Sequence, residues 1–89
     1  MQAHIFISGF VQGVGFRQFV KKNAIAIGLK GFVVNLSDSR VEVVVQGLKE
    51  DIEKLIKTCE KGPFLSEVKS VTVTWEDASE KFEEFFILS

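Results

Sequence analysis

The sequence predicts an α+β sandwich domain, in which two helices cover one face of a four- to five-stranded, mainly antiparallel sheet. Two observations lead to this fold class. Several short segments alternate apolar and polar residues with a period of two, which is typical of strands with one buried face. Two longer segments repeat apolar residues every three or four positions, which is typical of amphipathic helices.

The first strand is expected at residues 4–8, whose two isoleucines point to one face and whose phenylalanine points to the other. The glycine-rich segment Gly9–Gly15 follows this strand. At Phe16 the period changes to that of a helix, and Gly28 is expected to end the helix. One face of this helix, apolar except for its asparagine, consists of Phe16, Phe19, Val20, Asn23, Ala24 and Ile27.

Residues 30–35 and 40–46 are predicted to form a β-hairpin, because the segment between them (NLSDSR) is rich in turn residues. A second helix is expected from residue 48 until Gly62-Pro63 ends it. Its apolar stripe consists of Leu48, Ile52, Leu55, Ile56 and Cys59. A strand at residues 71–75 follows, and after a polar turn at residues 76–81 a short strand near Phe85–Leu88 ends the fold.

The order of these elements is β-α-β-β-α-β with one extra strand, which is the ferredoxin-like, split βαβ pattern. The composition, 46% hydrophobic and 26% charged, suits a single compact domain over residues 1–89. No apolar run reaches the ~20 residues that span a bilayer, and no signal peptide is recognisable. We therefore expect a soluble cytoplasmic protein without a membrane partner, and, since no surplus apolar face is evident, a monomer.

Cys59 is the only cysteine, so neither an intrachain disulfide nor a cysteine-based zinc site can form. Its position on the core stripe predicts an inert, buried thiol. The net charge of −1 argues against a nucleic-acid partner. Residues 1–45 carry a net +3 and residues 46–89 a net −4, so a small anionic ligand should prefer the first half of the chain.

The segment "SGFVQGVGFR" (Ser8–Arg17) predicts an anion site. The first amides of a helix lack intrahelical partners and lie at the positive end of the helix dipole, where an arginine is unfavourable unless an anion is bound. The glycines at positions 9, 13 and 15 let the backbone adopt positive φ and approach such a ligand. The alternative is that the glycines only form a tight connection and that Arg17 is solvated.

The sequence also resembles a known family. "GFVQGVGFR" (Gly9–Arg17) is similar to the N-terminal signature of the acylphosphatases, and "GFVVN" with "VEVVVQG" (Gly31–Asn35 and Val41–Gly47) is similar to their second signature. "GPFLSEV" (Gly62–Val68) and "FEEFFI" (Phe82–Ile87) resemble later segments of the family. The resemblance covers nearly the whole chain, with its motifs in the same order.

This resemblance implies an enzyme that hydrolyses acyl phosphates to a carboxylate and inorganic phosphate, without metal or organic cofactor. The catalytic arginine of the family falls on Arg17, and the asparagine that positions water falls on Asn35. Inorganic phosphate is then the product and a competitive inhibitor. The implied phosphate-binding residues are Val11, Gln12, Gly13, Val14, Gly15 and Arg17.

Three positions depart from the family pattern. The hairpin has Asp38-Ser39-Arg40 where Asp-Gly is common, Phe32 replaces a frequent Trp or Tyr, and His4 replaces a basic residue. His4 has no evident acidic partner and is expected to be a surface or sheet residue. These departures leave the implied chemistry in place and bear on the turnover rate.

Two other functions stay open on the sequence alone. One is a phosphate-binding module without activity, since acylphosphatase-like domains also begin larger hydrogenase-maturation proteins. The other is RNA binding through aromatic residues on the sheet, as in other ferredoxin-like domains. The chain lacks the corresponding aromatic motif and is slightly acidic, so we expect little retention on a polyanion.

Overall fold

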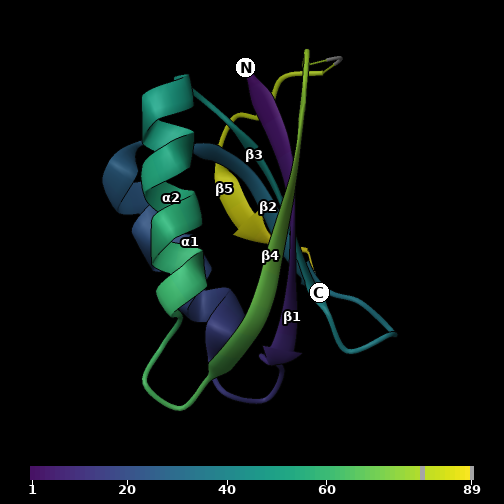
Figure 1. Ribbon diagram of the computed structural model, residues 1–89. Helices are drawn as coiled ribbons and strands as arrows, with labels where there is room; N and C mark the ends of the chain where they lie inside the picture. The colour runs from purple at the N-terminus through teal and green to yellow at the C-terminus, as the bar shows by residue number, and fades with distance from the viewer. Residues whose placement is uncertain (79, 89) are drawn as a thin grey trace.

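A computed structural model describes residues 1–78 and 80–88, so residue 79 of the expected polar turn and residue 89 of the expected domain lie outside the described part. Within these described residues, two helices and five strands follow one another in the chain order that Figure 1 traces from purple to yellow. In order they are β1 (Gln2–Phe10), α1 (Phe16–Ile27), β2 (Lys30–Asn35), β3 (Val41–Gln46), α2 (Lys49–Lys61), β4 (Glu67–Glu76) and β5 (Phe85–Ile87).

The five strands form one sheet in the order β4-β1-β3-β2-β5. The β1–β3, β1–β4 and β2–β3 pairs are antiparallel, whereas β5 lies parallel to β2 at the sheet edge. Both helices lie on the same side of the sheet (Figure 1). The predicted fold class, a mainly antiparallel α+β sandwich of the ferredoxin-like type, is confirmed.

The core lies between the helices and the sheet. On β1, Ile5 and Ile7 are fully buried, and their neighbours on β3, Val43 and Val41, are buried with them. α1 buries Phe16, Val20 and Ala24, and α2 buries Ile52, Leu55 and Cys59. Burial of a valine, leucine, isoleucine or phenylalanine side chain stabilises a fold by about 1.5–3 kcal/mol each. Here the buried Phe16 and Val20 hold the start of α1 against the sheet.

Cys59 is buried as predicted, and desolvation raises the pKa of its thiol to about 12.

Leu48 was expected in the apolar stripe of the second helix, and this expectation is wrong. Leu48 is the N-cap residue of α2 and 65% exposed, because its backbone is extended and the helix begins only at Lys49. Among residues 1–78 and 80–88, no helix has the length and apolar character to cross a membrane.

Candidate anion-binding site

A cavity of about 220 Å³ lies where the β1–α1 connection meets the end of β2 and the edge strand β5. It brings together residues that are far apart in the sequence, including four that the sequence singled out. The lining residues are Gly13, Gly15, Phe16, Arg17, Gln18, Asn35 and Ile87.

Two glycines of the β1–α1 connection have left-handed backbone conformations. Gly13 has φ 75° and Gly15 has φ 79°. Gly15 is the N-cap residue of α1 and supplies no side-chain cap, and the first turn contains no acidic residue. The first bond of the helix runs from Phe19 N to Gly15 O at 3.0 Å, so the amides of residues 16–18 precede the helical ladder. The positive end of α1 therefore borders the cavity without a capping acceptor.

Arg17 is half-buried in the first turn of α1 and lines the cavity. In the part of the chain that the structure describes, no carboxylate lies within 4.0 Å of its guanidinium, although four other ion pairs form. A half-buried guanidinium beside a helix N-terminus adds positive charge where the helix dipole is already positive. The cavity is thus strongly favourable for an anion.

Asn35 is the last residue of β2 and lines the same cavity. Its Oδ1 atom is buried, and it accepts no hydrogen bond from any residue that the structure describes. A buried side-chain acceptor without a partner is unfavourable by about 1–3 kcal/mol, so such an atom usually has a water or ligand partner. Asn35 therefore offers an unused amide oxygen beside the guanidinium cavity.

The remaining residues of the expected phosphate loop do not line the cavity with their side chains. Val11 is 1% exposed in the core, and Val14 packs against the core from outside. Gln12 Nε2 donates to the carbonyls of Leu36 and Arg40, at 2.8 and 2.9 Å. The side chains of this loop thus anchor it to the core and to the β2–β3 hairpin, which leaves only main-chain groups for a ligand.

The expected loop boundary at Gly9 is wrong, because Gly9 belongs to β1. The register of β1 against β4 shifts between Ser8 and Gly9, and Gly9 has φ 127°. A Cβ atom at this position would collide with the main chain of Glu67. Gly9 is therefore required for strand pairing, and it does not line the cavity.

The hairpin that follows Asn35 carries the departure from the family pattern. Ser39 adopts φ 79°, a conformation that glycine adopts more easily. The amide of Arg40 donates to Asp38 Oδ1 at 3.2 Å and lowers the pKa of the Asp38 carboxyl. The Arg40 guanidinium pairs with Asp38 at 2.8 Å and lies 4.8 Å from the ring centre of Phe6, outside the cavity lining.

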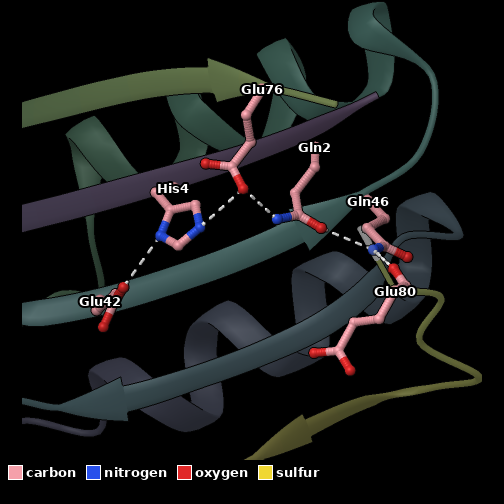
Figure 2. A network of polar contacts seen from close by, with 6 residues as sticks. All are labelled: Gln2, His4, Glu42, Gln46, Glu76 and Glu80. Atoms are coloured by element: carbon pink, nitrogen blue, oxygen red, sulfur yellow. Dashed lines mark hydrogen bonds and ion pairs between the residues drawn. The ribbon is translucent and has the colours of Figure 1, made fainter. Parts of the chain in front are cut away.

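His4 was expected to lack an acidic partner, and this expectation is wrong. Its imidazole lies between the carboxylates of Glu42 and Glu76, at 3.2 and 3.3 Å (Figure 2). Gln2 Nε2 also donates to Glu76, at 2.6 Å, and its Oε1 accepts from Gln46 at 2.7 Å. The two carboxylates come from β3 and β4, so only strand register places them beside His4.

Three lining residues, Phe16, Gln18 and Ile87, were not predicted from the sequence as site residues, and Phe16 was expected only on the buried face of the helix. Gln18 follows Arg17 in the first turn of α1. Its place beside Arg17 at the start of the predicted helix was therefore the sequence signal that could have identified it. Ile87 reaches the cavity because β5 pairs in parallel with β2, where Ile87 is opposite Val33. The sequence predicted this final strand but gave no signal for its partner.

The fold and the cavity define a ferredoxin-like domain with a cationic, glycine-lined cavity at the start of its first helix. A family model described as Acylphosphatase matches residues 3–87. The acylphosphatase of Chloroflexus aurantiacus is 44% identical over 88 residues, which cover 99% of this chain and 96% of that protein. The crystal structure of acylphosphatase from Bacillus subtilis matches with a TM-score of 0.95 and 34% identity, covering 99% of this chain and 98% of that one.

The chain belongs to the acylphosphatase family. A full-length HypF in a phosphate- and nucleotide-bound form also matches, with a TM-score of 0.90 and 37% identity, but the match covers 99% of this chain and only 12% of that one. The prediction of an acylphosphatase, a hydrolase, is thereby confirmed at the level of the family. The roles of individual residues stay predictions.

Proposed function

We propose that this protein hydrolyses acyl phosphates at the cavity between the start of α1 and the end of β2. The phosphoryl group is held by Arg17 and by main-chain amides of the connection that includes Gly13 and Gly15, and Asn35 positions the attacking water. The convergence of an unpaired guanidinium, free helix-start amides and an unpartnered amide oxygen in one cavity, within the described residues, carries this proposal.

The binding step follows from the charges. A phosphoryl group presents several anionic oxygens, of which a guanidinium can bind two in a fork. Amides at a helix start bind a further oxygen without any cost for their own reorganisation. Because charge spreads over these oxygens in the transition state of phosphoryl transfer, the same groups that bind the substrate also accelerate its hydrolysis.

The hydrolytic step needs an aligned water more than a strong base, because an acyl phosphate already carries a good leaving group. The Asn35 amide oxygen accepts a hydrogen bond from that water and fixes it in line with the bond that breaks. The P–O bond to the acyl oxygen breaks, the water oxygen bonds to phosphorus, and the water proton passes to a phosphate oxygen of the substrate. The products are a carboxylate and inorganic phosphate.

Benzoyl phosphate hydrolysis, with inorganic phosphate as competitor, tests the proposal. Arg17→Ala should lower kcat/KM by at least ~100-fold and abolish phosphate inhibition, since it removes the charged part of the cradle. Asn35→Ala should lower kcat by roughly 10- to 100-fold with KM little changed. Lys22→Ala, which removes an exposed charge from the same helix, is the matched control and should retain wild-type kinetics.

The same assay separates the enzyme from a phosphate-binding module without activity. Tight phosphate binding without hydrolysis by the unmodified chain would favour the module. Wild-type kcat in the Asn35→Ala variant would contradict the water-positioning role of Asn35 but not the proposed phosphate-binding site.

A further inference from the structure

The side chain of Gln12 connects two parts of the cavity that are distant in sequence. Its amide nitrogen carries two hydrogens, and it donates to Leu36 O at 2.8 Å and to Arg40 O at 2.9 Å. Gln12 directly precedes Gly13, and Leu36 directly follows Asn35. One side chain therefore links the glycine connection to the residue next to the proposed water-binding asparagine.

The two carbonyls that accept from Gln12 are those that close the β2–β3 hairpin. Leu36 N donates to Arg40 O at 2.8 Å, and Ser39 N donates to Leu36 O at 3.3 Å. The strand ladder itself ends one residue earlier, where Asn35 is opposite Val41. Gln12 thus adds a cross-link just beyond the last rung of the ladder.

This cross-link bears on the position of the Asn35 side chain. Its Oδ1 atom has no hydrogen-bond partner among residues 1–78 and 80–88, so its position depends on the backbone at the end of β2. A displacement of about 1 Å between reacting groups is enough to lower a rate about 100-fold. The backbone around residue 35 must therefore be fixed relative to the glycine connection.

We propose that Gln12 is a positioning residue, whose two hydrogen bonds fix Asn35 relative to the phosphate cradle. The inference deepens the proposed function and rests on it. It assigns to Gln12 a role that differs from ligand binding, since both of its donor hydrogens are used by the hairpin. Loss of the cross-link should then lower kcat, while Arg17 and the main-chain amides continue to bind phosphate.

Gln12→Met tests this role, because it removes both donors and keeps the length of the side chain. We expect kcat for benzoyl phosphate to fall about tenfold and the inhibition constant of inorganic phosphate to change less than about threefold. Gln12→Asn, which keeps the amide but shortens the side chain by one methylene, should give an intermediate kcat. Thermal melting followed by circular dichroism verifies that each variant is folded.

Gln46→Met is the matched control. Gln46 Nε2 also makes two hydrogen bonds, to Gln2 Oε1 and to Glu80 O (Figure 2). Gln46 lies five residues along β3 from Val41, the partner of Asn35, which corresponds to ~17 Å. Its loss should leave kcat unchanged.

A double-mutant cycle with Asn35→Ala distinguishes positioning from a general loosening of the loop. If Gln12 acts through Asn35, Gln12→Met should lower kcat less than twofold when Asn35 is already alanine. An equal loss in both backgrounds, or wild-type kcat for Gln12→Met in an active enzyme, would overturn this inference alone. An unmodified chain that does not hydrolyse benzoyl phosphate would overturn the proposed function and this inference together.

Discussion

The two ends of α1 allow a matched test of the glycine cradle. Gly15 at the start has φ 79° and ψ 18°, and Gly28 at the end has φ 96° and ψ 21°. A Cβ atom at either position would meet no heavy atom within 4 Å other than those of its own chain neighbours. Alanine at either site therefore adds backbone strain without a collision, and the two sites are separated by ~20 Å along the helix.

The expected size of the effect follows from the backbone. A left-handed conformation is unfavourable by about 1–2 kcal/mol for alanine, and the lower entropy of the unfolded alanine chain offsets about 0.5–1 kcal/mol of this. Gly15→Ala and Gly28→Ala should each destabilise the fold by about 1 kcal/mol, which lowers Tm by about 4–8 °C in a domain of this size.

Only Gly15→Ala should also change ligand binding. If the alanine loop relaxes to negative φ, phosphate must restore the left-handed conformation, and its affinity should fall about tenfold. Thermal melting and inhibition of benzoyl phosphate hydrolysis by inorganic phosphate measure the two effects separately. An equal loss of phosphate affinity in Gly28→Ala, or an unchanged affinity in Gly15→Ala, would refute the reasoning.

Two further predictions concern stability. The pKa of the Cys59 thiol is about 12 in the folded chain, whereas in the unfolded chain it has the ordinary value of 9.0. The stability that this group contributes is therefore fully present below pH 9 and is lost as the pH rises from 9 to 12. Relative to Cys59→Ala, the unfolding free energy measured with urea should fall by about 1 kcal/mol per pH unit in that range, and parallel pH profiles would contradict this. Ser39 is the only residue other than glycine with positive φ in the described part of the chain, so Ser39→Gly should raise Tm by about 2–8 °C, and a lower Tm would contradict this.

The parts of the fold that the sequence predicts well are those with local causes. The helix from Phe16 to Ile27 and its stop at Gly28 follow from apolar spacing and a glycine, and both are found. Arg17 and Asn35 were identified from a helix start and from the family resemblance, and the structure places both at one cavity. Their chemical roles are still to be tested by experiment.

The parts that could not be predicted depend on which strands become neighbours. The carboxylates beside His4 come from two strands on either side of β1, and no local pattern indicates that arrangement. The same holds for Ile87, which reaches the cavity through a parallel pair, and for Gln12, whose partners lie 24 and 28 residues away. The prediction for Leu48 was wrong for a different reason. An apolar residue just before a helix continues the helical spacing without being part of the helix.

A titration of the ¹⁵N-labelled chain with inorganic phosphate, followed by NMR, tests the central claim most directly. A phosphoryl group in the cavity should shift the main-chain amides of Gly13, Gly15 and Arg17 and the side-chain amide of Asn35, with saturation at a common Kd. These shifts should disappear in Arg17→Ala. Saturable shifts confined to the groove between α2 and β4, which includes Trp75, or no saturable shifts at all, would contradict the account.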